Sequence, residues 1–132
     1  MIKFTIYGNP VTKKNSSRIV MAGKRPRLLP SEAYSAYELN FKAECMARGL
    51  WNKMLSQPLN VACTYYMQTK RRVDLTNLLS ATMDCLVAAR VMEDDNCRIV
   101  CSHDGSKVLY DKAIPRVEIE IKELMNDVER ST

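Results

Sequence analysis

Hydrophobic and polar positions alternate near both ends of the chain, which is the pattern of β-strands with one buried face. In residues 2–6, isoleucine and phenylalanine alternate with polar side chains, and Gly8-Asn9-Pro10 ends the run. In residues 116–121, valine and isoleucine repeat with the same period of two. Leu59 to Met67 is rich in valine, threonine and tyrosine, which favours a third strand.

Shorter signals predict further β structure. Ser17 to Met21 and Arg25 to Leu29 flank Ala22-Gly23-Lys24, which indicates a hairpin. Arg98 to Ser102 predicts a short strand, and the Asp104-Gly105 pair that follows it is typical of a turn.

Two segments have the period of an α-helix. Pro30-Ser31-Glu32 opens the first, with Ser31 as the cap, and Tyr34, Tyr37, Phe41 and Cys45 fall on one face before a stop at Gly49. The second begins at Asp74 and runs to about Ala88. Its apolar face comprises Leu75, Leu78, Leu79, Thr82, Leu86 and Ala89.

These elements predict one α+β domain over residues 1–132, a small mixed β-sheet packed with two main helices. The 132 residues fit one domain, and 46% hydrophobic residues are enough for a core. The tail from about residue 123 is polar and is expected to form a last helical turn or to fray.

Composition excludes several classes of protein. No apolar run approaches the length of about 20 residues that spans a bilayer, so we expect no membrane partner. The first ten residues lack a secretory signal, which favours an intracellular, cytoplasmic protein. The five cysteines form no CxxC pair and His103 is the only histidine, so we expect reduced thiols rather than a zinc site.

Positive charge is clustered along the chain. The formal net charge is +5, and an excess of this size alone is weak evidence for a nucleic-acid partner. Clusters of cations are typical of a surface that follows phosphates, although a solvated positive face is the simpler alternative. The candidate DNA-binding residues are Lys13, Lys14, Arg18, Lys24, Arg25, Arg27, Lys70, Arg71 and Arg72.

Carboxylates lie at both ends of the second helix. Asp74 stands at its start, and Glu93-Asp94-Asp95 follows its end. Asp74 could simply cap the helix, and the acidic triplet could be a solvated turn. If the strand after the helix pairs with the strand before it, Asp95 returns towards Asp74. Converging aspartates are the ligands that Mg²⁺ or Mn²⁺ prefers beside a phosphate.

The segment VDLTNLLSATMDCLVAARVMEDDN resembles the signature region of the RusA family of Holliday junction resolvases. The family pattern is D-x-D-N and a hydrophobic pair, then a helix with an aspartate, then D-D before a strand. The opening YGNPVTKK and the closing PRVEIEI also resemble the family. The matching central positions are Asp74, Asn77, Leu78, Asp84, Leu86, Asp94 and Asp95.

The resemblance implies a homodimeric α+β endonuclease that acts on four-way DNA junctions and needs a divalent metal, Mg²⁺ or alternatively Mn²⁺. Asp74 and Asp95 carry over as metal ligands, whereas Thr76 replaces the second aspartate of D-x-D and Ser80 replaces a family lysine. Asp104 is our first candidate for the missing acid, with Lys107 for the missing lysine, although Asp104 could equally serve the turn. Asp94 is a further candidate ligand, and Asn77, Asp84 and Thr76 are expected beside the ligands.

Three functional hypotheses follow. The first is a metal-dependent endonuclease that resolves Holliday junctions in DNA recombination and repair. The second is a non-catalytic module that binds branched DNA or RNA and retains the fold. The third is an unrelated basic α+β protein whose acids are caps and turns. Metal dependence separates the first from the second, and affinity for branched DNA separates both from the third.

Overall fold

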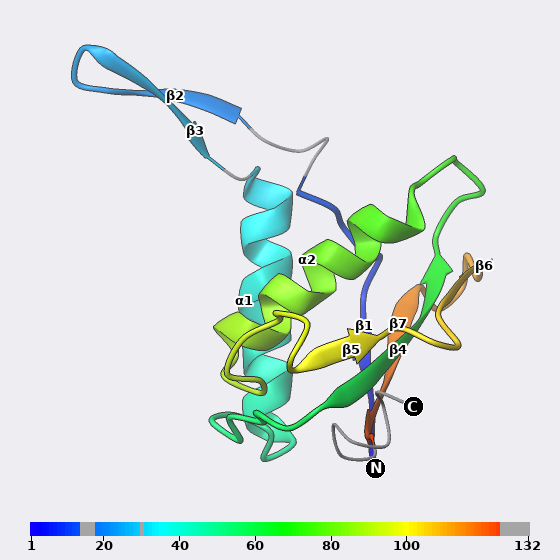
Figure 1. Ribbon diagram of the computed structural model, residues 1–132. Coiled ribbons are helices and arrows are strands. Elements are labelled where there is room, and N and C mark those ends of the chain that lie inside the picture. Colours follow the sequence, from blue (N-terminus) through cyan, green and yellow to red (C-terminus); the bar gives the residue numbers. More distant parts are fainter. Residues whose placement is uncertain (14–17, 30, 125–132) are drawn as a thin grey trace.

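The chain forms a mixed β-sheet with two helices and a separate β-hairpin (Figure 1). A computed structural model describes residues 1–13, 18–29 and 31–124. The elements in chain order are β1 (Ile2–Tyr7), β2 (Arg18–Ala22), β3 (Arg25–Leu29), α1 (Glu32–Ala47), β4 (Leu59–Met67), α2 (Leu75–Ala88), β5 (Val100–Ser102), β6 (Lys107–Tyr110) and β7 (Arg116–Glu123). The α+β prediction is therefore confirmed.

Strand β4 holds the main sheet together. The order is β1-β7-β4-β5, and β6 also pairs with β4. β7 is antiparallel to both β1 and β4, whereas β5 and β6 run parallel to β4. β5 pairs with the beginning of β4 and β6 with its end, so together they form one edge of the sheet, interrupted at residues 103–106.

Alternating residues give the sheet one buried face. Val117, Ile119 and Ile121 of β7 are buried, as are the apolar positions of β1 and the alternate residues of β4. Both helices lie on this face, and the other face carries polar side chains such as Glu118 and Glu120 (Figure 1). The alternation in the sequence therefore correctly predicts which side chains of these strands face the helices and which face away.

Helix α1 is capped and buried as its sequence predicts. The Ser31 hydroxyl accepts a hydrogen bond from the Tyr34 amide at 3.0 Å. Beyond the last turn, Gly49 has φ +70°, a left-handed conformation that favours glycine and ends the helix. The buried face comprises Tyr34, Tyr37, Phe41 and Cys45.

Helix α2 connects β4 to the parallel strand β5. It begins after Asp74, and its buried residues lie between Leu78 and Leu86. The Tyr34 hydroxyl lies 3.6 Å from the Cys85 sulfur, which brings α1 and α2 into contact in the core. The expected pairing of the strand after the helix with the strand before it is thus confirmed.

The hairpin agrees with the sequence prediction, whereas the two short strands β5 and β6 differ from it. The hairpin is present as β2 and β3, and it extends away from the sheet and helices (Figure 1). Strand β6 was not predicted, because its residues are all exposed and show no alternation. The short strand begins at Val100 rather than Arg98. The tail after Leu124 lies outside the described residues.

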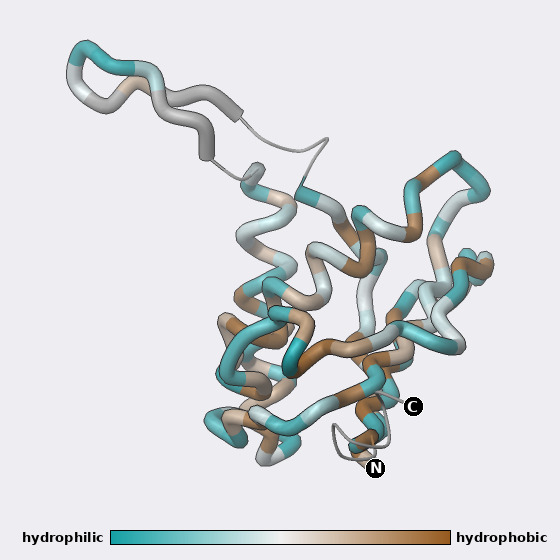
Figure 2. Tube along the Cα trace, in the orientation of Figure 1, coloured by the Kyte–Doolittle hydropathy of each residue, from teal (hydrophilic) through white to brown (hydrophobic). Residues whose placement is uncertain are grey.

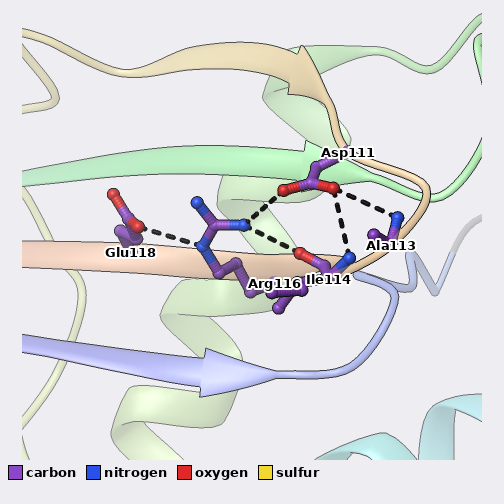
Figure 3. Close-up of polar contacts among 5 residues, drawn as sticks. All are labelled: Asp111, Ala113, Ile114, Arg116 and Glu118. Atoms are coloured by element: carbon purple, nitrogen blue, oxygen red, sulfur yellow. Dashed lines mark hydrogen bonds and ion pairs between the residues drawn. The ribbon is translucent and has the colours of Figure 1, made fainter.

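Arg116 fastens the turn between β6 and β7 (Figure 3). Its guanidinium donates to the Asp111 carboxylate at 2.9 Å and to Glu118 at 3.0 Å, and it stacks on the Tyr66 ring at 3.8 Å from the centroid. Asp111 also accepts from the Ala113 and Ile114 amides, so a single carboxylate joins the turn to β7.

One buried hydroxyl pair joins β4 to α2. Thr82 donates to the Leu78 carbonyl at 2.9 Å, so the Tyr65 hydroxyl, 2.7 Å from the Thr82 oxygen, must be the donor of that bond. Tyr65 is fully buried. By contrast, the buried Tyr37 hydroxyl has no hydrogen-bond partner among the described residues.

We therefore predict unequal effects of three hydroxyl deletions, measured by urea unfolding. Thr82→Val should lower the free energy of unfolding by about 1–3 kcal/mol, because it leaves the Tyr65 hydroxyl buried without its acceptor. Tyr65→Phe should cost about 1 kcal/mol, because Thr82 keeps its bond to Leu78.

Tyr37→Phe is the matched control and should leave stability unchanged or higher, since its hydroxyl has no partner among the described residues. The Thr82→Val/Tyr65→Phe double variant should lose less than the sum of the single losses. Equal losses for Tyr37→Phe and Tyr65→Phe would contradict the assigned hydrogen bond.

Candidate functional site

A hollow of about 270 Å³ lies against α2. Thr76, Leu79, Ser80 and Met83 of the helix form one wall. Their spacing of three and four residues places them on one side of α2. Asp95 and His103, which come from the segments after the helix, also line the hollow. The hollow thus brings Asp95 to the same place as Thr76 and Ser80, three positions that the sequence analysis singled out.

The side chain of Asp94 makes the hydrogen bonds of the turn, and the side chain of Asp95 lines the hollow. The Asp94 carboxylate accepts hydrogen bonds from the Asp95 amide at 2.8 Å and from the Asn96 side chain at 3.0 Å. These bonds lower the pKa of Asp94 below its ordinary value. The acidic triplet therefore contains one structural aspartate and one that faces the hollow.

The charge of Asp95 is disfavoured where it lies. Partial burial raises its pKa above the ordinary aspartate value, and the negative charges of Asp84 and Asp94 raise it further. A carboxylate held with its pKa raised accepts a proton or a cation more readily than a solvated one, which is a common property of functional sites.

Asp84 connects this side of the helix to the N-terminal basic segment. Its carboxylate forms an ion pair with the Lys13 ammonium at 3.2 Å. The same ammonium lies 5.2 Å from the centroid of the Tyr34 ring. Lys13 is thus held beside Asp84, which lies on α2 one turn beyond Ser80.

Asp74 occupies the N-cap position of α2 but does not act as a side-chain cap. Its carboxylate instead accepts from the Asn77 side-chain amide at 3.2 Å. Asp74 is exposed and is not part of the wall of the hollow, so Asp95 faces the middle of α2 rather than its first residue.

Asp104 and Lys107 lie elsewhere. They line a separate hollow on the open face of the sheet, together with residues such as Glu118 and Lys122. The Asn60 side chain binds both the amide and the carbonyl of Asp104, which fits the turn alternative. His103, the first residue after β5, lines the hollow against α2, whereas Asp104 lies in the turn that follows and lines the hollow on the open face of the sheet. The structure does not bring Asp104 or Lys107 to the wall that Asp95 shares.

The basic connector, residues 69–73, forms a second hollow directly before α2. Its volume is about 470 Å³, and Asn9, Thr69, Arg71 and Arg72 contribute polar groups to it. Asn9 accepts from the Gln68 amide at 2.9 Å, which joins the Gly8-Asn9-Pro10 turn to the connector. Lys70 points elsewhere, 5.1 Å from the Tyr110 ring centroid. Figure 2 shows this hydrophilic stretch between β4 and α2.

The other predicted DNA-binding residues are distributed along the projecting hairpin. Lys24 and Arg25 are exposed at its turn, Arg18 begins β2 and Arg27 belongs to β3. Lys14 lies outside the described residues. The described cations therefore do not form one continuous patch with the connector.

The comparison with known protein families agrees with this arrangement. The model of the family described as "Endodeoxyribonuclease RusA" matches residues 8–122, which include the residues lining the Asp95 hollow and the connector hollow and every strand except β1 and the last residue of β7. The chain belongs to the RusA endodeoxyribonuclease family. A search of curated proteins gave no match. No described helix is long and apolar enough to cross a membrane.

Divalent-metal dependence is general among RusA resolvases, so the donor set needs a test against a metal ion. Residues 1–13, 18–29 and 31–124 contain no group of three or more acidic, histidine or cysteine side chains placed to hold a metal. The hollow contributes one carboxylate, two hydroxyls and one imidazole. This set does not fit a Mg²⁺ site built from several carboxylates.

His103 is the site residue that our sequence analysis missed. We considered it only as a zinc ligand, and without nearby cysteine pairs it carried no further weight. The available signal was positional. His103 follows the strand that returns from the Asp94-Asp95 turn, so it can reach the same side of α2 as Asp95.

The two adjacent aspartates should affect stability in opposite directions. The folded state raises the pKa of Asp95, so Asp95→Asn should raise the melting temperature at pH 7 by removing a disfavoured charge. The folded state lowers the pKa of Asp94, so Asp94→Asn should lower it. Both differences should shrink as the pH falls from about 6 to about 3, where the wild-type carboxylates become protonated. Thermal unfolding monitored by circular dichroism across this range is the measurement, and shifts of the same sign would contradict the assignment.

Proposed function

We propose that this RusA-family protein is a structure-selective endonuclease that cuts four-way DNA junctions. The observation that carries the proposal is the position of the two hollows on α2. The basic connector leads directly into the helix, and the Asp95 hollow follows along the same helix. A phosphodiester backbone held at Arg71 and Arg72 would continue towards Asp95.

In this proposal, different residues bind the DNA and act at the scissile phosphate. Arg71 and Arg72 would bind phosphates next to the cut, and cations on the hairpin would contact an adjoining DNA arm. The Asp95 carboxylate, whose pKa is raised, would orient the attacking water and accept its proton. Lys13 beside Asp84 would balance negative charge that develops on the phosphate. Asp74, exposed at the start of α2, lies between the two hollows in sequence and would face the same strand of DNA.

Two further elements of the proposal come from the family resemblance. A junction has approximate two-fold symmetry, so paired cuts require two active sites and favour a homodimer. Mg²⁺ or Mn²⁺ remains the expected metal requirement of the reaction.

A second candidate function is supported by a specific observation. Thr76 and Ser80 are both neutral, and both face the hollow where the resemblance implies a carboxylate and a lysine. A protein that bound branched DNA without cutting it would retain the basic connector and the hairpin while tolerating this loss.

Nicking of a synthetic four-way junction separates the two functions. We expect cleavage by the wild type with Mg²⁺ or Mn²⁺ and none by Asp95→Asn or Asp74→Asn, both of which should still bind the junction in a gel-shift assay. Glu93→Gln is the matched control, because Glu93 is exposed in the same acidic stretch but lines neither hollow. Wild-type binding without cutting would favour the second function. Full-rate cutting by Asp104→Asn would remove Asp104 from the candidate ligands.

The Arg71 and Arg72 contacts should appear as a change in salt dependence. The logarithm of the affinity falls as the logarithm of the salt concentration rises. Replacing both arginines with alanine should make this slope shallower by roughly one unit for each lost phosphate contact. The matched control is Lys53→Ala/Arg90→Ala, which removes the same charge from exposed positions distant from the connector, with Arg90 following the other end of α2. Equal slopes for the two double variants would place the connector outside the DNA path.

A further inference from the structure

An exposed apolar strand lies at the edge of the sheet. Among the described residues β6 pairs with β4 alone, so its other side is open (Figure 1). All four of its residues are exposed, and three of them, Val108, Leu109 and Tyr110, are large and apolar. A group of neighbouring exposed apolar side chains is typical of an interaction site. The strand is therefore a candidate contact surface that the proposed function does not yet use.

The alternation along β6 places Tyr110 on the same side of the sheet as α2. Lys107, the first residue of the strand, lines the hollow on the open face, so Tyr110, three residues later, points to the other face. The residue paired with Tyr110 in β4 is Met67, and Met67 lines the connector hollow. The Tyr110 ring thus lies beside the hollow to which Arg71 and Arg72 contribute.

A positive charge accompanies the exposed ring. The Lys70 ammonium lies 5.1 Å from the centroid of the Tyr110 ring, which is a cation–π contact, and Lys70 is followed directly by the two connector arginines. An aromatic plane beside cations matches the two parts of a nucleotide, because the base stacks on the ring and the phosphate binds the positive charge.

Hydrogen bonds hold the backbone next to Tyr110 in place. The Asp111 amide donates to the Met67 carbonyl at 2.9 Å. The Asp111 carboxylate accepts from the Arg116 guanidinium at 2.9 Å, which fastens the turn and balances the negative charge closest to the ring in sequence (Figure 3). A side chain whose backbone is fixed before binding loses less conformational entropy when a ligand stacks on it.

We infer that Tyr110 recognises the branch point of the DNA by stacking on a base at the crossover, while Lys70 contacts the adjoining phosphate. The inference rests on the proposed function for its ligand, branched DNA, and deepens it by assigning the residue that distinguishes a junction from a duplex. Inside a duplex every base is stacked between two neighbours, whereas the stack is interrupted at a branch point. Stacking reads no sequence, since every base has an aromatic face.

The affinities for a four-way junction and for a linear duplex, both measured in EDTA so that no DNA is cut, test the inference. Tyr110→Ala should weaken junction binding about tenfold and leave duplex binding unchanged, which also shows that the variant is folded. Tyr110→Phe should bind like the wild type because the ring is sufficient, and Tyr110→Leu should behave like Tyr110→Ala. Unchanged junction affinity in Tyr110→Ala, or an equal loss for both DNAs, would overturn the inference.

Trp51→Ala is the matched control. Trp51 is 39% exposed, close to the 45% of Tyr110, but it lies in the segment between α1 and β4 and lines neither the connector hollow nor the Asp95 hollow. This variant should bind both DNAs like the wild type. A loss of junction affinity equal to that of Tyr110→Ala would overturn the special role of Tyr110.

A fluorescent base reports the stacking directly. 2-Aminopurine is quenched when another ring stacks on it, so a junction with 2-aminopurine next to the crossover should be dimmer when bound to wild type or Tyr110→Phe than when bound to Tyr110→Ala. The same base placed one helical turn along an arm should give equal fluorescence in all three complexes. Equal fluorescence at the crossover for wild type and Tyr110→Ala would overturn the inference.

The outcomes distinguish this inference from the proposed function. Junction selectivity that depends on Tyr110, without any cutting, would support the stacking contact and overturn the nuclease proposal. Junction cutting by Tyr110→Ala with wild-type rate and selectivity would support the nuclease proposal and overturn the stacking contact. If light scattering gave a dimer for the wild type and a monomer for Tyr110→Ala, the ring would belong to an interface between copies of the chain, which would also overturn the inference.

Discussion

The hydrogen-bonding requirement of β4 organises the whole molecule. β4 is interior to the sheet, so its backbone groups need partners on both sides. On one side, β7 pairs with it along its length. On the other side, β5 and β6 pair only with its two ends, and the gap is closed by the side chains of Asn60, His103 and Ser106. The chain therefore turns at Asp104-Gly105 while His103 stays fixed beside α2.

The same strand also positions the helix against which the site is built. α2 follows β4 through the basic connector, and the Tyr65–Thr82 hydrogen bond holds the helix onto the buried face of the sheet. With α2 fixed, residues three and four apart present Thr76 and Ser80 to the same side. The turn at residues 93–96 then returns the chain to the sheet and places Asp95 opposite them. The candidate site is thus a direct result of a β–α–β connection.

Two neighbouring aspartates at the hollow have opposite environments. Asp94 and Asp95 are adjacent, yet hydrogen bonds favour the charge of Asp94 whereas partial burial disfavours that of Asp95. Asp84 is balanced by Lys13, which itself packs near Tyr34. Membership of the RusA family accounts for the framework over residues 8–122.

The sequence by itself determined the class of fold, both helices, the strands of the sheet interior and the family. These features depend on local periodicity and on short motifs, which residues near one another in the chain express directly. Ser31 as a cap and the alternation in β7 are examples. β6 carried no such signal, because an exposed edge strand is held by its neighbour rather than by a buried face of its own.

Only the tertiary structure decided which polar residues meet. Sequence spacing did not indicate that Asp95 and His103 line a hollow with Thr76, and Asp104 is only one residue further from Asp95 along the chain than His103 is. The chain turns immediately after His103, so His103 lines the hollow beside the helix while Asp104 lines the hollow on the open face. The His103 ring is held by its hydrogen bond with the Val61 carbonyl. These placements depend on pairing between segments about 40 residues apart, and no local pattern encodes such contacts.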